Sequence, residues 1–201
     1  MKNIAVFASG RGTNFAAIIR AVRRGKIKAN LSLLVCDNPK AQAIQRAKRA
    51  KIKVALVKRE GYPGKKEFEA EITRRLKEEN ISLIVLAGFM RILSSEFVHQ
   101  YAGRILNIHP TLLPSFKGKE GIRDAFDYGV KITGVTVHFV DEKMDHGPII
   151  LQQPLKIEEK DTLETLEAKI HKIEHKLYPE AVRLFTEDRL KIEGRSVRVS
   201  S

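Results

Sequence analysis

Short apolar runs alternate with amphipathic stretches along the first half of the chain, and this alternation constrains the fold more than any other feature. The apolar runs have the length and composition of buried strands, and they cover residues 4–8, 31–36, 54–57 and 83–87. Helical patterns separate them at residues 14–24, 41–50 and 65–79. Strands that alternate with helices at this spacing form parallel sheets, because each helix carries the chain back to the start of the next strand. We therefore expect an α/β fold with a Rossmann-like, doubly wound and mostly parallel sheet.

The second half of the chain follows a different pattern. Residues 105–108 are expected to form a short strand, and residues 133–140 and 149–155 two further strands. The polar segment between the last two strands is too short for a helical crossover. We therefore expect these two strands to pair antiparallel, which places antiparallel strands in the C-terminal half of the sheet.

A long helix is expected after the last of these strands. Its apolar stripe consists of Leu163, Leu166, Ile170, Ile173 and Leu177. Asp161 with Glu164 resembles a capping box at the start of this helix, and Pro179 marks its end or a kink. Residues 194–201 are expected to be a frayed, flexible tail. Because no repeat or linker interrupts the chain, we expect a single domain over residues 1–193.

The bulk composition fits one compact domain in the cytoplasm. The chain has 201 residues, of which 43% are hydrophobic, enough for one sizeable core. No apolar run approaches the ~20 residues that a membrane helix needs, and the first residues lead directly into a strand-like run rather than a secretory signal. A single cysteine, Cys36, cannot form an internal disulfide, which fits a reducing compartment.

The net charge of +13 is distributed unevenly. Residues 1–59 contain fifteen Lys or Arg and one acidic residue, Asp37, whereas the remainder of the chain is nearly neutral. Such a basic half can bind nucleic acid, steer a small anionic substrate, or consist of solvated helix faces. No aromatic residues are interleaved with Lys48, Arg49 and Lys51, so no platform for stacking bases is visible. Charge alone does not decide among these alternatives, although nucleic acid is not an expected partner.

A glycine-containing loop, Ser9-Gly10-Arg11-Gly12-Thr13-Asn14, joins the first expected strand to the first helix. The glycines allow a sharp turn with consecutive amide donors, and the helix N-terminus adds partial positive charge, so a phosphate can bind there. The loop lacks the third glycine of the dinucleotide fingerprint and suits a monophosphate better than a pyrophosphate. A tight strand-to-helix turn without a ligand is the structural alternative.

Asn107 and His109 stand at the end of the expected strand at 105–108, within NIHPTLLP at residues 107–114. Residues two apart on a strand point to the same face, and ligands of parallel sheets bind beyond the carboxyl ends of strands. An Asn amide can donate to an oxyanion, and a His can act as donor or general acid. The pair is thus a candidate catalytic centre, with a polar strand end and a satisfied histidine as the alternative.

Asp145 lies in the polar segment between the two antiparallel strands, in DEKMDHGPI. A carboxylate next to His109 would favour the imidazolium form and could orient a proton-carrying water. The sequence does not place the two side chains together, and an ordinary acidic turn residue is the alternative.

Taken together, these segments resemble the glycinamide ribonucleotide formyltransferase family, purine-pathway enzymes that use 10-formyltetrahydrofolate. The matching stretches are SGRGTN at 9–14, LAGFMRILS at 86–94, NIHPTLLP at 107–114, TGVTVHFVDEKMDHGPII at 133–150 and EHKLYP at 174–179. The order and spacing of these stretches fit the family, and together they cover nearly all of the chain up to about residue 190. The resemblance implies an α/β formyltransferase fold, a folate co-substrate, small-molecule substrates and no metal.

The resemblance also implies roles for individual residues. Asn107 and His109 would stabilise the tetrahedral intermediate and move its proton, while Asp145 tunes the histidine. The substrate-binding residues would be Gly12, Thr13 and Asn14 at the phosphate, and His171 and Glu174 near the amine or ribose. The folate-binding residues would be Met90, Arg91, Ile92 and Leu93 at the pterin, Asp141, Glu142, Lys143 and Met144 on the other wall, and Lys65 near the glutamate tail.

Two positions depart from the family pattern. The loop after Pro114 reads Gly118-Lys119-Glu120-Gly121-Ile122, where many relatives have one or two histidines. His171 stands where a glutamine is often found. These departures put in doubt a loop-histidine contribution and the ribonucleotide contact at position 171, but they leave Asn107, His109 and Asp145 unchanged.

Several other functions fit parts of the sequence. A methionyl-tRNA formyltransferase or a formyltetrahydrofolate deformylase would share the Asn-Ile-His-Pro core, although each usually has an additional domain. Residues 171–175 match HxxEH, a zinc-peptidase signature. An RNA-binding module would use the basic first half. A homo-oligomer is compatible with the sequence in each case.

Overall fold

A computed structural model describes residues 1–200 of the chain. The chain divides into two units, Met1–Leu106 and Asn107–Ser201, which we call the first and the second unit. The single domain expected over residues 1–193 stays a prediction. Among the described residues, no helix has the length and apolar character that crossing a membrane requires.

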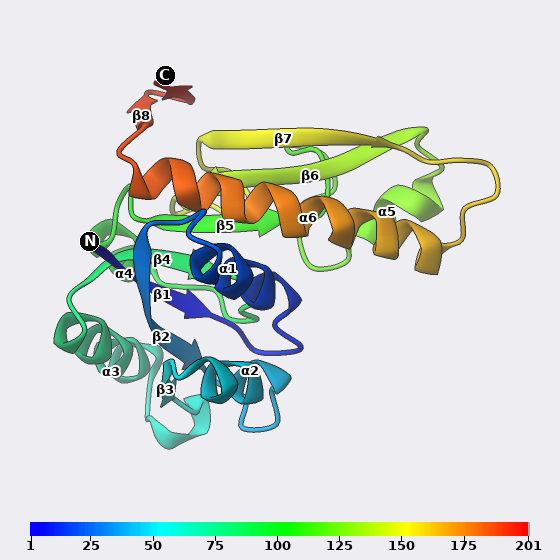
Figure 1. Ribbon diagram of the computed structural model, residues 1–201. Helices are drawn as coiled ribbons and strands as arrows, with labels where there is room; N and C mark the ends of the chain where they lie inside the picture. The colour runs from blue at the N-terminus through cyan, green and yellow to red at the C-terminus, as the bar shows by residue number, and fades with distance from the viewer. Residues whose placement is uncertain (201) are drawn as a thin grey trace. The chain divides into compact units, whose positions relative to one another are not determined.

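The first unit alternates strands and helices, as expected. Its strands are β1 (Lys2–Phe7), β2 (Ala29–Cys36), β3 (Lys53–Leu56) and β4 (Ile81–Leu86). Its helices are α1 (Thr13–Arg23), α2 (Gln42–Ala50), the short 3-10 helix η1 (Arg59–Gly61), α3 (Lys65–Glu78) and α4 (Ser95–Gln100). The strands pair in parallel in the order β3-β2-β1-β4 (Figure 1). Residues 4–8 are completely buried, because a central parallel strand is covered on both faces, which explains their continuous apolar run.

The strand order creates a switch point between β1 and β4. The chain moves outward from β1 through β2 to β3, and then returns to add β4 on the other side of β1. The loops that follow β1 and β4 therefore leave the carboxyl edge of the sheet at the switch point, which is where open α/β sheets bind ligands. Two of the sequence-predicted binding segments, at residues 9–14 and 90–93, are these loops.

The second unit contains the antiparallel pair. β5 (Ile105–His109) leads into it, followed by α5 (Gly121–Tyr128), β6 (Ile132–Phe139), β7 (Ile149–Lys156), α6 (Leu163–Thr186), β8 (Leu190–Glu193) and β9 (Ser196–Val199). β6 and β7 pair antiparallel from Ile132 opposite Lys156 to His138 opposite Ile149, which confirms the expectation. The long helix α6 packs on β6 and β7 (Figure 1), with Leu166, Ile170 and Ile173 of the predicted stripe buried.

The start of α6 differs from the expected capping box. Thr162 is the N-cap in place of the predicted Asp161 and Glu164 pair. Its hydroxyl accepts a hydrogen bond from the Thr165 amide at 3.2 Å, and its own amide donates to the Thr165 hydroxyl at 2.9 Å. Asp161 instead accepts a hydrogen bond from the Lys169 amine at 2.7 Å and one from the Glu158 amide at 2.9 Å. Because the Asp161 carboxylate already accepts these two hydrogen bonds, the hydroxyl of Thr162 caps the helix instead.

The C-terminal part contains Pro179 and a further pair of strands. Pro179 lies inside α6, which continues to Thr186. Proline removes one helical hydrogen bond, and the burial of Ala181, Val182 and Leu184 after it anchors the last turns. Residues 194–200, expected to be a frayed tail, include β9, which pairs antiparallel with β8. Ser201 lies outside the described residues.

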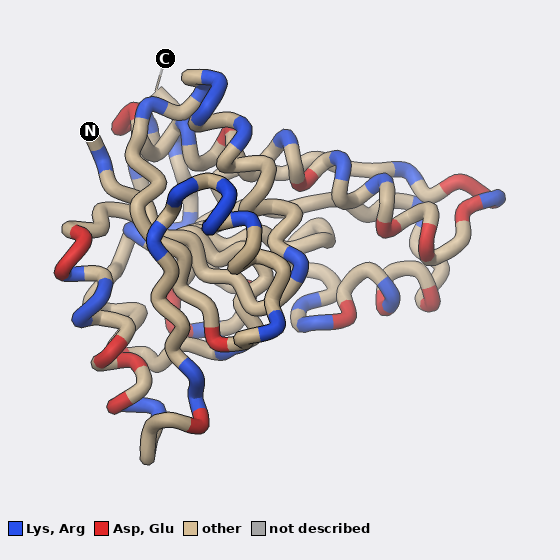
Figure 2. The backbone as a smooth tube through the Cα atoms, turned by 60° about the horizontal axis from the view of Figure 1, so that its bottom comes forward, with Lys and Arg blue, Asp and Glu red and all other residues tan. Residues whose placement is uncertain are grey.

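The basic excess of the first unit gathers partly at helix ends. Arg20 and Arg23 occupy the last turn of α1, and Lys48 and Arg49 that of α2 (Lys and Arg are blue in Figure 2). Cations in this position face the negative end of the helix dipole. The Arg23 guanidinium also donates to the backbone carbonyl of Arg49 at 3.3 Å. These residues thus have a structural role in stabilising helix ends.

Candidate active site

The loop after β1 has the geometry of an anion-binding turn. Gly12 has a positive φ of 66° directly before α1, and a Cβ there would lie 2.9 Å from the Ala43 Cβ, so glycine is required. Thr13 and Asn14 form the first helical turn, which contains no acidic residue. The positive end of the helix dipole is therefore not offset by a neighbouring carboxylate within that turn, which favours an anion.

The loop after β4 is tied to the loop after β1. The Ser9 amide donates to the Gly88 carbonyl at 3.0 Å, and the Met90 amide donates to the Ser9 hydroxyl at 3.0 Å. At its far end the Ser94 amide donates to the buried Glu69 carboxylate at 2.8 Å. The two predicted binding loops of the first unit thus form one anchored structure at the switch point.

Between these anchors the loop exposes apolar side chains. Met90 and Ile92 are 55% and 65% exposed, whereas Arg91 is turned onto the sheet edge, its Nε 2.7 Å from the Asp37 Oδ2. Leu93 is half-buried. Exposed apolar side chains on an anchored loop are a surface that a flat aromatic ligand can cover. Lys65, the remaining predicted residue of this unit, is exposed at the first residue of α3.

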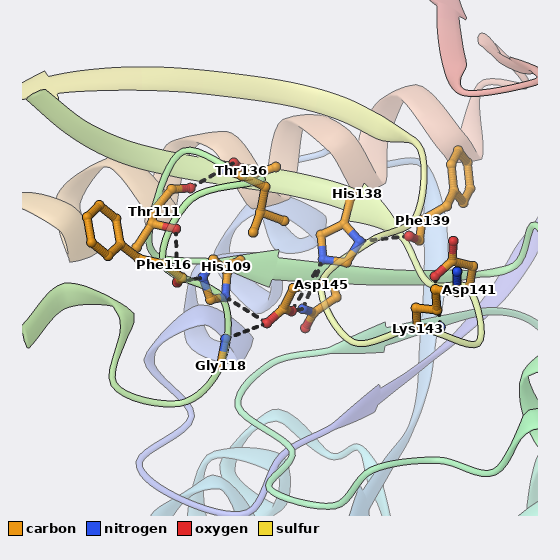
Figure 3. Close-up of polar contacts among 12 residues, drawn as sticks. His109, Thr111, Phe116, Gly118, Thr136, His138, Phe139, Asp141, Lys143 and Asp145 are labelled. Atoms are coloured by element: carbon orange, nitrogen blue, oxygen red, sulfur yellow. Dashed lines mark hydrogen bonds and ion pairs between the residues drawn. The ribbon is translucent and has the colours of Figure 1, made fainter. Parts of the chain in front are cut away.

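In the second unit the structure brings Asn107, His109 and Asp145 together, and Figure 3 shows His109 next to Asp145. Asn107 and His109 leave the same face of β5, as their spacing predicts. The Asn107 Nδ2 lies 3.4 Å from the Asp145 Oδ1, and the His109 Nδ1 lies 3.5 Å from the Asp145 Oδ2. The three side chains that sequence reasoning proposed from distant segments therefore form one polar cluster.

Both ring nitrogens of His109 face oxygen acceptors. The Nε2 donates to the Phe116 carbonyl at 2.8 Å, since a carbonyl can only accept. The Nδ1 faces the Asp145 carboxylate, and the His109 ring is almost completely buried. An imidazolium satisfies both acceptors with N–H groups, whereas a neutral ring would direct one lone pair at an oxygen. Each ring nitrogen of His109 is therefore placed to donate an N–H group to an oxygen.

Asp145 is held in an unusual backbone conformation at the centre of the cluster. It has a positive φ of 48°, which costs free energy for a non-glycine residue. Its Oδ2 also accepts a hydrogen bond from the Gly118 amide at 2.9 Å. Gly147 fixes this turn from the other side, since a Cβ there would lie 1.9 Å from the Phe139 carbonyl oxygen. The turn thus directs one carboxylate at Asn107, His109 and the loop after β5.

His138 is the member of the cluster that sequence reasoning missed. Its ring on β6 is 2% exposed, and its Nε2 lies 3.2 Å from the Asn107 Nδ2. Burial lowers the pKa of His138, and this effect is larger than the opposite effects of the Phe139 carbonyl and of the Asp145 carboxylate, which both raise it. The irregular pairing of β6 and β7 falls between Val137 and His138, and such bulges redirect side chains. A polar residue inside an apolar strand was the signal that could have identified it.

The predicted wall residues lie in the turn after β6. The Asp141 Oδ2 accepts from the His146 Nδ1 at 2.6 Å, and its Oδ1 accepts from the Lys143 amide at 3.1 Å. Glu142, Lys143 and Met144 are exposed. Asp141 therefore shapes the turn, while the exposed residues present a mixed charged and apolar surface.

The predicted ribonucleotide contacts His171 and Glu174 lie one turn apart on α6. The His171 Nδ1 lies 2.8 Å from the Glu174 Oε2, and the Glu174 side chain is buried. The two residues of this HxxEH segment thus contact each other directly. Within residues 1–200, no group of three or more His, Cys, Asp or Glu side chains is arranged to hold a metal ion.

Comparison with known proteins finds relatives that match nearly the whole chain. The Formyl transferase family matches residues 2–182. The phosphoribosylglycinamide formyltransferase of Bacillus subtilis is 46% identical over 183 residues, which are 91% of this chain and 94% of that protein. Its counterpart from Haemophilus influenzae is 39% identical over 96% of this chain and 91% of its own length. A crystal structure of glycinamide ribonucleotide transformylase 1 from Symbiobacterium toebii superimposes with a TM-score of 0.97 and 43% identity, covering 100% of this chain and 95% of that one.

Proposed function

This chain belongs to the formyl transferase family, and we propose on that basis that it transfers the formyl group of 10-formyltetrahydrofolate to the amine of glycinamide ribonucleotide. This reaction is a step of de novo purine biosynthesis, and it requires small-molecule substrates and no metal. The cytoplasm is its expected location. The observation that carries the proposal is the cluster of Asn107, His109 and Asp145 at the end of β5.

The chemistry begins with the neutral amine of the substrate. Its lone pair attacks the formyl carbon, and the carbonyl oxygen becomes an oxyanion. When the intermediate collapses, the bond to folate N10 breaks and N10 gains a proton, while the former ammonium nitrogen loses one. The net reaction therefore needs groups that stabilise the oxyanion and carry a proton, and it needs no acyl-enzyme intermediate.

His109 supplies the first of these groups. Its Nε2–H already donates to an oxygen, the Phe116 carbonyl, at 2.8 Å. We assign the substrate oxyanion to this donor, with displacement of the Phe116 carbonyl when substrate binds. The Asp145 carboxylate stabilises the imidazolium from the other side and orients the proton transfer.

Asn107 supplies the second donor. Its Nδ2 lies 3.2 Å from the His138 ring and 3.4 Å from the Asp145 carboxylate. The longer and weaker contact is the one that an oxyanion would replace. Asn107 and His109 then approach the same oxygen from neighbouring positions on one strand.

The family resemblance suggests the binding roles, and the local structures of each unit support several of them. Gly12, Thr13 and Asn14 hold the ribonucleotide phosphate at the start of α1, and His171 with Glu174 contacts the substrate near its amine or ribose. The exposed apolar loop after β4, with Met90, Arg91, Ile92 and Leu93, covers the pterin. Asp141, Glu142, Lys143 and Met144 also contact the folate, and Lys65 pairs with the glutamate tail.

An assay with three formyl acceptors distinguishes this function from those of related formyl-folate enzymes. The purified protein is incubated with 10-formyltetrahydrofolate and either glycinamide ribonucleotide, initiator methionyl-tRNA or water alone, and the formylated product or formate is measured. We expect rapid formyl transfer only with the ribonucleotide. Preferential formylation of the tRNA would identify a methionyl-tRNA formyltransferase, and formate release without an acceptor a deformylase. Activity that a chelator abolishes would contradict the metal-free mechanism, and salt-sensitive RNA binding without formyl transfer would contradict an enzymatic role.

A further inference from the structure

His138 makes two hydrogen bonds that together fix its tautomer. The Nδ1 lies 2.7 Å from the Phe139 carbonyl oxygen, which can only accept, so the Nδ1 carries a proton. The ring is buried and its pKa is lowered, which keeps it neutral at neutral pH. The Nε2 is therefore a lone-pair acceptor, directed at Asn107.

The Asn107 amide lies between two acceptors. Its Nδ2 is 3.2 Å from the His138 Nε2 and 3.4 Å from the Asp145 Oδ1, while these two acceptors are 3.8 Å apart. If the amide turned over, its oxygen would face a lone pair and a carboxylate. The NH2 group is therefore held toward His138 and Asp145, and both of its hydrogens are directed.

Only one of these two acceptors can keep its bond when the reaction proceeds. The proposed oxyanion takes the hydrogen that Asp145 holds at the longer distance. Among the described residues, the shorter contact, to His138, then remains to prevent the Asn107 amide from turning its oxygen toward the negative charge. An acceptor-to-oxyanion contact at this point would repel the intermediate instead of stabilising it.

We propose that His138 is a positioning residue, whose neutral Nε2 holds the Asn107 amide with its second N–H directed at the oxyanion. The inference rests on the proposed formyl transfer and deepens it. His138 itself does not touch the reacting atoms. Its role differs from that of a packing residue, because it depends on an acceptor atom at the Nε2 position and acts only through Asn107.

Two substitutions separate these roles. His138→Gln can place an amide oxygen near the Nε2 position, whereas His138→Leu fills the space without an acceptor. We expect His138→Leu to lose about 10- to 10²-fold in kcat, up to the cost of losing one oxyanion donor, with KM for both substrates nearly unchanged. His138→Gln should keep kcat within about threefold of wild type, since it restores the acceptor.

A double-substitution cycle tests the dependence on Asn107. In an Asn107→Ala background, His138→Leu should reduce kcat by no more than about twofold further, because the amide that it positions is already gone. Equal losses in the two backgrounds would show that His138 acts elsewhere and would overturn the proposal. A folded His138→Gln protein as impaired as His138→Leu would overturn it as well.

Nitrogen-15 NMR of the labelled wild-type chain gives a readout that requires no activity and remains informative if His138→Leu does not fold. At neutral pH we expect the His138 ring to show the neutral tautomer with the proton on Nδ1. A proton on Nε2, in either the other tautomer or the cation, would overturn the proposal. If the wild-type protein transfers no formyl group, the proposed function fails, and these ring shifts still decide the hydrogen-bond arrangement.

Discussion

Replacing Asp145 by asparagine changes the centre of the polar cluster with almost no change in volume. The two carboxylate oxygens face donors on both sides. The Oδ1 faces the Asn107 amide at 3.4 Å, and the Oδ2 accepts from the Gly118 amide at 2.9 Å and faces the His109 Nδ1 at 3.5 Å. An asparagine side chain has one oxygen and one NH2 group, so either orientation sets a donor against a donor. The substitution also removes the negative charge next to the His109 ring.

The expected loss of activity follows from the contact between Asp145 and His109. Two unit charges 3.5 Å apart attract by about 5 kcal/mol at an effective dielectric constant of ~20. The amide retains part of this through its dipole, so we expect a loss of about 3 kcal/mol in transition-state stabilisation. A loss of this size corresponds to a decrease in kcat of at least about 10²-fold. KM should change little, because the imidazolium matters most once the oxyanion has formed.

The assay is steady-state formyl transfer with each substrate varied up to saturation, which gives kcat and KM, and folding is verified by circular dichroism. Asp161→Asn is the matched control, because its carboxylate is also buried, also lies in the second unit and also accepts several hydrogen bonds. The control should lose stability and keep wild-type turnover. A folded Asp145→Asn protein with wild-type turnover would refute the reasoning, and an unchanged kcat with greatly raised folate KM would assign Asp145 to the pocket wall.

Three further predictions concern the frame of the site. Gly12→Ala should weaken ribonucleotide binding and lower the melting temperature, since the new Cβ at φ 66° meets the Ala43 Cβ at 2.9 Å; an unchanged KM would exclude Gly12 from the phosphate site. Thr162→Ala should destabilise the chain by about 1 kcal/mol in urea unfolding through loss of the α6 cap, and a stability equal to wild type would place the cap elsewhere. Hydrogen bonds from Lys169, and then from the Glu158 amide, lower the pKa of Asp161 from 3.8 to about 2. The ionised Asp161 therefore stabilises the folded state fully at pH values above its unfolded-state pKa of 3.8, and this stabilisation is lost as the pH falls toward 2. The difference in unfolding free energy between wild type and Asp161→Asn should shrink across that range.

The sequence predicted those parts of the fold that arise from local periodicity. The continuous apolar run at residues 4–8 predicts a central strand, because only a strand covered on both faces lacks polar alternation. The spacing of Asn107 and His109 predicts that they share a face of β5. The family resemblance, the fold class and the enzyme class were confirmed by the comparisons.

Contacts between distant segments could not be predicted from local patterns. Asp145 reaches His109 because its turn adopts a positive φ and packs against Phe139 at Gly147, and neither property is visible in the composition of the turn. The position of His138 depends on a bulge in the pairing of β6 with β7. The cap of α6 was misassigned because Asp161 and Thr162 are both good capping residues, and only tertiary contacts decide between them.

The rate of formyl transfer by His109→Ala tests the central claim most directly. It is measured in a single turnover with 10-formyltetrahydrofolate and glycinamide ribonucleotide at saturation, with His99→Ala as a control on the exposed surface of α4. Because His109 donates to the oxyanion in this account, the variant should remain folded and lose at least about 10² in rate, while the control keeps the wild-type rate. A folded His109→Ala protein that transfers the formyl group at the wild-type rate would contradict the account.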